Sequence, residues 1–141
     1  MTPPDFPQPV SGPAYGRTFR GLATAMLLAV VAMAARATLS LPQDDAAAQG
    51  YWMLGVGMLA LVASYWVLIR STTTIDDAGI RQTGLTDKKV VWSEVHSARL
   101  FGPPFARRLM VRTANGRFRF FFGGSPELLD AFARIAAAYR P

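Results

Sequence analysis

Cysteine is absent from this chain of 141 residues, and histidine occurs once, as His96. Without a thiol the chain forms no disulfide, no thiolate metal site and no iron–sulfur cluster, and it has no cysteine nucleophile. A single histidine also excludes a metal site built from several imidazoles. No catalytic constellation of other residues is present, so we expect no metal, no cofactor and no enzymatic activity.

Charged residues are also scarce, at 17% of the chain against about 25% in a typical soluble domain. Hydrophobic residues reach 51%, which excludes a mainly disordered chain, because disorder requires low hydrophobicity and high charge. The few charges are unbalanced, with 15 Lys and Arg against 9 Asp and Glu. The chain is therefore hydrophobic and basic, and its length suits one compact domain of roughly 100–150 residues.

Two long apolar runs account for the scarcity of charge. Residues 21–41 contain one charge, Arg36, and residues 50–69 contain none. As helices these runs would be about 31 and 30 Å long, which matches a hydrocarbon core of about 30 Å. Arg36 lies close enough to the end of its run to reach the membrane interface. We predict transmembrane helices over residues 21–41 and 50–69, joined by an external loop over residues 42–49.

Paired aromatic residues stand at both ends of the second run. Tyr51 and Trp52 lie at one end, and Tyr65 and Trp66 lie at the other. Tyrosine and tryptophan are enriched at membrane–water interfaces, because each ring is apolar and carries one polar group. A buried helix of a soluble protein would normally show a polar face, which this run lacks. We interpret the four residues as interfacial anchors.

The first twenty residues hold five of the ten prolines, so we predict a flexible tail over residues 1–20, ending in the basic pair Arg17 and Arg20. An alternative interpretation is a cleaved signal peptide. Its apolar core would be residues 21–35, and Ala35-Arg36-Ala37 would be the cleavage site. The long proline-rich start and the second apolar run that follows favour a retained first helix.

The distribution of Lys and Arg predicts the orientation of the hairpin. Arg17 and Arg20 precede the first run, and Arg70 follows the second. Residues 71–141 then carry eleven Lys or Arg and six Asp or Glu, a net charge of +5 out of a total of +6. By the positive-inside rule both termini face the cytoplasm and the loop faces outward. A cleaved signal peptide would leave the C-terminal region on the same side.

The pattern of residues 71–141 predicts a sheet followed by one helix. β-Branched and hydrophobic runs, separated by turn residues, predict strands over residues 72–75, 80–84, 89–95, 96–101, 107–113 and 117–122. Ser125-Pro126-Glu127 is typical of a helix start, and hydrophobic residues then recur at helical spacing up to Tyr139. We predict an α+β, mainly β, domain in which a strongly bent sheet is capped by a C-terminal helix.

A hairpin centred on Asn115-Gly116, the preferred dipeptide of a two-residue type I′ loop, suggests a binding face. That loop would place Arg112 opposite Arg119 and Met110 opposite Phe121 on the outer surface. A like-charge pair costs stability unless an anion lies near it. Basic and apolar side chains together suit an anionic membrane surface, although a solvated basic surface is the plain alternative. The predicted lipid-binding or partner-binding face consists of Arg108, Met110, Arg112, Arg117, Arg119 and Phe121.

Four segments resemble a known family. They are Ile75-Asp76-Asp77-Ala78-Gly79-Ile80, Val91-Trp92-Ser93-Glu94-Val95, the Asn115-Gly116 hairpin and the helix start at residues 125–129. They are similar to the bacterial pleckstrin-homology-like (PH-like) domains carried on two-helix membrane proteins. The resemblance covers residues 71–141 and implies a roughly seven-stranded, barrel-like sheet with a C-terminal helix. It implies a bacterial inner membrane but no single function, and residues 71–141 are few for seven strands.

We therefore expect a non-catalytic binding module on a membrane anchor. Its partners would be anionic lipid headgroups or another membrane protein. The alternative is an accessory or assembly subunit of a larger membrane complex, or an oligomer of this chain, in which the spans form the main interface. We expect no nucleic acid as a partner, because the spans hold the domain at the membrane and no nucleic-acid motif is present.

Overall fold

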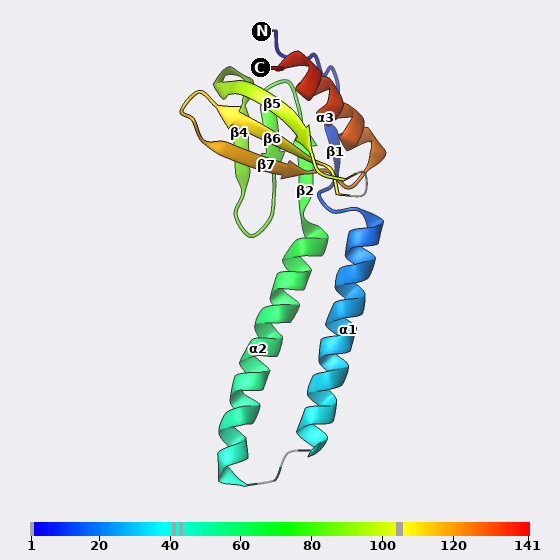
Figure 1. Cartoon of the computed structure of the whole chain (residues 1–141), viewed down its shortest axis with the longest axis vertical. Helices are drawn as coiled ribbons and strands as arrows, with labels where there is room; N and C mark the ends of the chain where they lie inside the picture. The colour runs from blue at the N-terminus through cyan, green and yellow to red at the C-terminus, as the bar shows by residue number, and fades with distance from the viewer. Residues whose placement is uncertain (1, 41, 43, 104–105) are drawn as a thin grey trace.

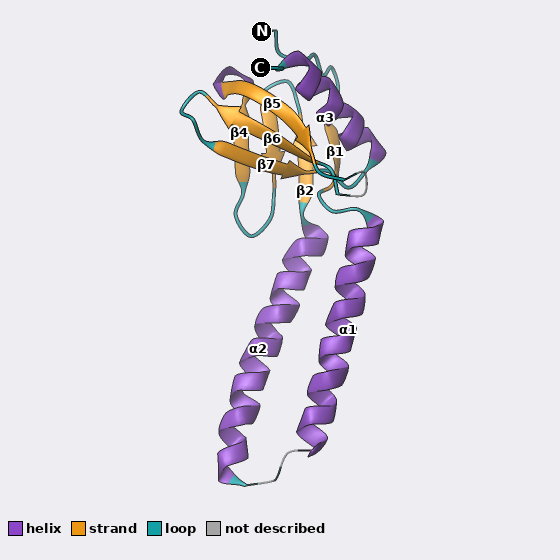
Figure 2. Cartoon of the chain, in the orientation of Figure 1, coloured by secondary structure: helices purple, strands orange, loops and turns teal. Residues whose placement is uncertain are grey.

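A long helical hairpin carries a β domain at one end (Figures 1 and 2). The structure is a computed structural model that describes residues 2–40, 42, 44–103 and 106–141. The hairpin consists of α1 (Arg17–Ser40) and α2 (Asp45–Arg70). Both helices are long and apolar enough to cross a membrane, by their length and composition. Large hydrophobic side chains such as Met33, Trp52 and Leu59 are exposed along them.

Both helices extend beyond the predicted apolar runs. α1 begins at Arg17 and so includes the basic pair that was assigned to the tail. α2 begins at Asp45, where Asp44 caps it by accepting a 2.9 Å hydrogen bond from the Ala47 amide. The predicted loop over residues 42–49 is therefore too long, because residues 45–49 are helical. Residues 41 and 43 lie outside the described residues.

The domain is built from two antiparallel sheets. The first has the order β1 (Val10–Pro13), β2 (Thr72–Ile75), β3 (Gly79–Gln82) and β4 (Lys88–Val91). A short 3-10 helix over Trp92–Glu94 leads into the second sheet, which consists of β5 (Val95–Phe101), β6 (Arg108–Thr113) and β7 (Phe118–Phe122). The chain then forms α3 (Pro126–Ala138). The prediction of a mainly antiparallel β domain with a C-terminal helix is confirmed.

The N-terminal segment belongs to this domain. β1 pairs with β2 from Val10 opposite Ile75 to Pro13 opposite Thr72. Phe6 is only 4% exposed, and its ring stacks on Trp92 with the centroids 6.0 Å apart. The prediction of a flexible tail over residues 1–20 is therefore wrong. Proline is tolerated at the edge of a sheet, and β1 is an edge strand.

α3 covers the core through one apolar face. Ser125 caps the helix by accepting a hydrogen bond from the Leu128 amide, which confirms the predicted helix start. Leu128, Phe132 and Ile135 are fully buried in the cluster that the two sheets enclose. At the end of the helix Tyr139 stacks on Trp92, at 6.2 Å between ring centroids. Trp92 thus lies between residues from both ends of the chain.

Side chains of the first sheet bind the free edge of β7. The Phe122 amide donates a 3.0 Å hydrogen bond to the Gln82 side chain, and the Thr73 hydroxyl donates a 2.6 Å bond to the Phe122 carbonyl. Lys88 donates to the carbonyl of Phe120 at 3.3 Å. Gln82 and Thr73 are buried polar residues, and these bonds satisfy them. The two sheets are therefore joined along the edge of β7 that is not paired with β6, and side chains of the first sheet make the hydrogen bonds there.

The helical hairpin is inserted between β1 and β2. The chain passes from β1 directly into α1 and returns from α2 directly into β2. The Ala14 amide donates a 2.9 Å hydrogen bond to the Ser71 carbonyl, so the two connections lie side by side. Both chain termini lie at the end of the domain away from the hairpin (Figure 1).

Candidate functional site

The predicted binding face lies on β6 and β7, but its register differs from the prediction. Arg112 lies opposite Phe118, and Met110 lies opposite Phe120. The predicted pairs, Arg112 with Arg119 and Met110 with Phe121, are wrong by one residue. No like-charge pair therefore stands at the centre of this face.

The cause is the length of the β6–β7 loop. The Thr113 amide bonds the Arg117 carbonyl at 2.9 Å, so Ala114, Asn115 and Gly116 form a three-residue loop. Gly116 has a φ of 75°, whereas no residue other than glycine has a positive φ in the described chain. A type I′ turn needs positive φ at both central residues, so Asn115 cannot take part in one here. A three-residue loop with glycine in the left-handed region is the other common hairpin.

The shift changes which residues face outward. Phe121 is fully buried in the core, so it leaves the candidate face. Arg119 lies opposite Val111 and is half-buried, on the same side of β7 as Phe121. Arg117 is exposed beside the loop. Of the six predicted residues, Arg108, Met110 and Arg112 share the outer face of β6.

Phenylalanines that the sequence argument missed complete this outer face. Phe118, Phe120 and Phe122 line β7, and the register places Arg99 and Phe101 of β5 beside Met110 and Arg108. Phe101, Phe118 and Phe120 are exposed. Residues 118, 120 and 122 lie on one side of a strand, so the sequence would have identified these rings if the register of the hairpin had been known. We call this surface the Arg/Phe face, and it consists of Arg99, Phe101, Arg108, Met110, Arg112, Phe118, Phe120 and Phe122.

The basic and aromatic groups of the Arg/Phe face are in contact. The Arg108 guanidinium lies 5.7 Å from the ring centre of Phe101 and 5.9 Å from that of Phe122. Arg112 lies 5.8 Å from the ring centre of Phe118. Such cation–π contacts hold the guanidinium groups without neutralising their charge. The face therefore presents fixed positive charge beside exposed apolar rings.

Arg108 stands between this face and a cavity on the hairpin side of the domain. The cavity has a volume of about 340 Å³ and is lined by Tyr15, Phe19, Arg107, Arg108 and Phe122, among others. The Nε atom of Arg108 is buried and has no hydrogen-bond partner. Burial raises the pKa of the Tyr15 hydroxyl above its ordinary value.

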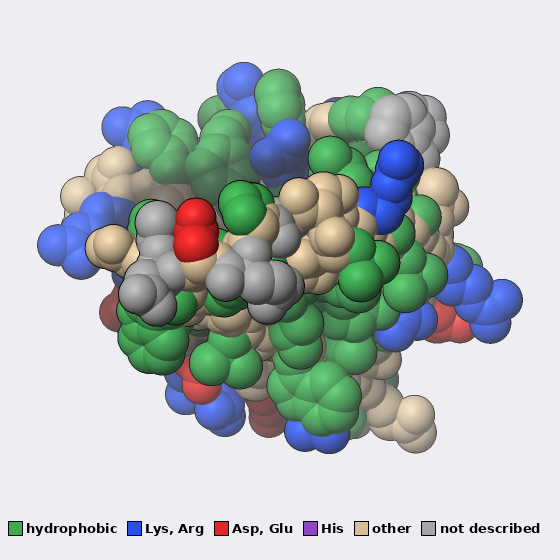
Figure 3. Space-filling model, turned by 90° about the horizontal axis from the view of Figure 1, so that it is seen from below, with side chains coloured by type: hydrophobic (Ala, Val, Ile, Leu, Met, Phe, Trp, Pro, Cys, Tyr) green, Lys and Arg blue, Asp and Glu red, His purple; other side chains and the backbone are tan. Residues whose placement is uncertain are grey.

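Acidic side chains do not neutralise the Arg/Phe face. The ion pair that the structure gives among the described residues, Arg81 with Asp87, lies outside it. Figure 3, which views the molecule from below, shows hydrophobic and basic side chains interleaved on the side from which the helices project. In the described part of the chain, no group of three or more His, Asp or Glu residues is placed to hold a metal ion.

The four predicted anchors lie near the two ends of α2. The Tyr51 hydroxyl donates to the Thr38 carbonyl at 3.0 Å, and the Tyr65 hydroxyl lies 2.6 Å from that of Thr24. Both tyrosines therefore link α2 to α1. Trp52 is exposed, and Trp66 lies beneath the Arg70 guanidinium at 4.2 Å from its ring centre.

The chain matches no protein-family model, no curated protein and no solved structure.

Proposed function

We propose that the chain is an integral inner-membrane protein whose cytoplasmic domain is PH-like and contacts anionic lipid headgroups through the Arg/Phe face. The helices α1 and α2 are the membrane anchor. The arrangement of four strands, then three strands, then one capping helix supports the PH-like assignment. β1 supplies the strand for which residues 71–141 had no room.

The observation that carries the proposal is the contact of Arg108 with Phe101 and Phe122 on a surface without acidic partners. Arginines beside exposed rings attract phosphate through charge while the rings enter the apolar part of the interface. Each Lys or Arg near an anionic leaflet contributes about 1 kcal/mol. Phe122 also lies 5.3 Å from the Tyr15 ring, next to the start of α1, so this end of the face is close to the anchor.

The insertion of the hairpin between β1 and β2 supports the proposed orientation. Both connections enter one domain, so both must lie on one side of the membrane. The excess of Lys and Arg in the domain and at the helix ends makes that side the cytoplasm. Cleavage after Ala37 would remove β1 and Phe6 from the fold, so this arrangement supports a retained first helix.

The test uses the full chain in nanodiscs, with a donor fluorophore on an Asn115→Cys variant and an acceptor on the lipid headgroups. The chain has no native cysteine, so the label has one site. We expect stronger energy transfer in bilayers with phosphatidylglycerol than in pure phosphatidylcholine, because the Arg/Phe face tilts onto anionic lipid. Added salt should reduce the difference, since exposed charges are screened.

The matched variants reverse the same number of charges at two places. Arg99→Glu with Arg112→Glu changes two exposed residues of the Arg/Phe face and should abolish the lipid dependence. Arg140→Glu with Arg134→Glu changes two exposed residues on and after α3, and it should preserve the dependence. Because Arg134 donates a 2.9 Å hydrogen bond to the Asp5 carbonyl and lies 4.8 Å from the Phe6 ring centre, the unfolding midpoint of this variant is measured alongside, to show that its fold is intact. If the protein without these charge reversals gave equal energy transfer in bilayers with phosphatidylglycerol and in pure phosphatidylcholine, the proposed headgroup contact would be wrong.

The second candidate function is an accessory subunit whose spans bind another membrane protein. It is favoured by an apolar cavity of about 250 Å³ between α1 and α2, lined by Met26, Leu27, Val30, Leu61 and Leu68, among others. A further helix would fill such a groove. Purification in mild detergent should then recover a second protein or a second copy, and recovery of the single chain would contradict this candidate.

A further inference from the structure

The loop between β3 and β4, residues 83–87, holds the most exposed large hydrophobic side chain in the described part of the domain. Leu85 is 85% exposed, more than any ring of the Arg/Phe face. A single exposed leucine is common on soluble surfaces and needs no explanation by itself. Two further observations distinguish Leu85 from such a residue, namely its position beside α2 and the hydrogen bonds at the base of its loop.

The loop lies beside the last turns of α2. In Figure 1 it descends from the sheet toward the hairpin, on the side of α2. Leu85 and Thr86 line a cavity of about 250 Å³ whose opposite wall includes Ser64, Val67 and Leu68 of α2. A neighbouring cavity of about 210 Å³ joins Gly84 and Asp87 to Trp66 and Arg70. The loop tip therefore reaches the level at which Trp66 and Arg70 mark the end of the apolar helix.

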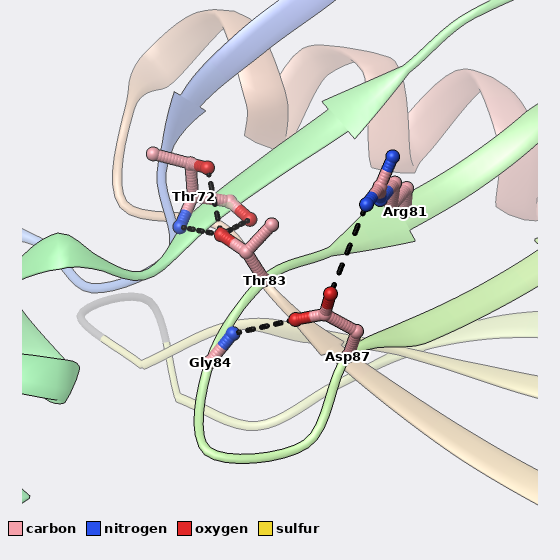
Figure 4. A network of polar contacts seen from close by, with 5 residues as sticks. All are labelled: Thr72, Arg81, Thr83, Gly84 and Asp87. Atoms are coloured by element: carbon pink, nitrogen blue, oxygen red, sulfur yellow. Dashed lines mark hydrogen bonds and ion pairs between the residues drawn. The ribbon is translucent and has the colours of Figure 1, made fainter.

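Hydrogen bonds fix the base of the loop to the start of β2. The Thr83 amide donates a 2.9 Å bond to the Thr72 carbonyl, and the Thr72 amide donates a 3.1 Å bond to the Thr83 hydroxyl. The two hydroxyls are 2.9 Å apart. Because Thr72 is separated from the end of α2 by Ser71 alone, these bonds set the position of the loop relative to the helix (Figure 4).

Asp87 holds the other side of the loop. One carboxylate oxygen accepts a 3.4 Å hydrogen bond from the Gly84 amide, and the other lies 3.7 Å from the Arg81 guanidinium (Figure 4). The negative charge nearest to Leu85 in the loop is thus paired with a cation. Lys88 and Lys89 follow at once in the sequence, so the loop joins an apolar tip to basic flanks.

We propose that the β3–β4 loop inserts Leu85 into the interfacial region of the bilayer that holds α1 and α2, as a third point of attachment. The inference rests on the proposed membrane anchor, but it does not require the Arg/Phe face. An apolar tip continuous with the apolar surface of α2 loses its contact with water in the bilayer. The basic flanks of the loop then lie at the height of the headgroups.

The experiment places an environment-sensitive fluorophore on single cysteines in the full chain, reconstituted in phosphatidylcholine vesicles. Leu85→Cys reports the loop tip, and Thr86→Cys gives a second, adjacent reporter. Asp77→Cys is the matched aqueous control, because it is exposed in the turn at the opposite end of β3. Val56→Cys, near the middle of α2, is the reference inside the bilayer.

We expect the label at Leu85 to emit at shorter wavelength than the label at Asp77. Lipids that carry a quencher near the headgroup should quench it more strongly than aqueous iodide does. The label at Val56 should be quenched best by a quencher deep in the acyl chains. Water-like emission and full iodide quenching at both Leu85 and Thr86 would overturn the proposal, provided that the Val56 label is shielded. Water-like behaviour at Val56 as well would instead show that the membrane anchor itself is wrong.

Discussion

At the scale of single residues, a few polar side chains decide how the two sheets meet. Gln82 and Thr73 point from the first sheet to the backbone of Phe122, where an ordinary sheet would place another strand. A buried backbone group without a partner costs more than its hydrogen bond contributes to stability. These side chains are therefore structural, although polar residues in a core often suggest a functional site.

Thr73→Val should lower the free energy of unfolding by about 1–3 kcal/mol, because it leaves the partly buried carbonyl of Phe122 without its donor. The neighbouring change Thr74→Val is the matched control. Its hydroxyl contacts that of Ser11 at an exposed position, so the loss should stay within about 0.5 kcal/mol. Urea unfolding of the full chain in mild detergent, followed by tryptophan emission, measures both. Equal losses of unfolding free energy in the two variants would show that the bond from Thr73 to β7 contributes no more than the exposed contact of Thr74.

The register of the β6–β7 hairpin is a residue-scale feature that the sequence could not determine. Asn115-Gly116 suits both a two-residue and a three-residue loop, and the two differ by one position. A slip of one residue exchanges the two faces of a strand. The arginines at 108 and 112 kept their predicted outward orientation because they belong to β6. On β7, Phe121 and Arg119 exchanged places with Phe120 and Phe118.

At the scale of elements, local patterns identify nearly every helix and strand except β1. The apolar runs predict α1 and α2, and β-branched runs and turn residues predict β2 to β7. The strand predicted over residues 89–95 is too long, because β4 ends at Val91 and the chain then forms the 3-10 helix Trp92–Glu94. β1 is four residues long, contains a glycine and a proline, and shows no alternation of its own. Only its pairing with β2 identifies β1 as a strand, and the whole helical hairpin separates the two strands in the sequence. A short strand of this kind is visible only in the folded chain.

Residues 71–141 alone should therefore fail to form the native domain, since they lack β1 and Phe6. Joining residues 1–16 to them through a short Gly-Ser linker should restore it, because the bond between Ala14 and Ser71 shows that the ends to be joined are adjacent. Trp92 is the only tryptophan in both proteins, and its stacking on Phe6 makes its emission a direct measure.

The control is Phe6→Ala in the joined protein, which should cost about 3–5 kcal/mol of stability, as for other large-to-small changes in a core. Asp5 and Pro7 flank this position, but neither side chain is buried in the core cluster. If residues 71–141 alone gave the same emission and the same unfolding midpoint as the joined protein, the assignment of β1 to the domain would be wrong.

At the scale of the whole molecule, the domain and the hairpin constrain each other. The two ends of the hairpin are held together by β1 and β2, and the tyrosines of α2 bond to α1 along its length. The predicted spans follow from sequence patterns alone. The relation between the spans and the domain does not, because it depends on pairing between residues far apart in the chain.

Topology can be measured with the same single-cysteine approach in intact spheroplasts. A membrane-impermeant maleimide should label Ala48→Cys at the start of α2. Gln8→Cys and Asp77→Cys should react only after the membrane is permeabilised, because both ends of the hairpin are proposed to be cytoplasmic. Labelling of Gln8→Cys from outside would contradict this orientation. Loss of that cysteine from the mature protein would show cleavage of a signal peptide.

The interruption of the domain by the hairpin has a consequence for biogenesis. β1 leaves the ribosome before its partner β2, which is synthesised only after both helices. Until then β1 has nothing to pair with, and Phe6 has no core to enter. If α1 and α2 span a membrane as proposed, a chain that inserts α1 in the wrong direction would leave residues 1–16 on the opposite side of the membrane from β2. Completion of the domain would then depend on the correct insertion of α1, because β1 and Phe6 are part of its sheet and core.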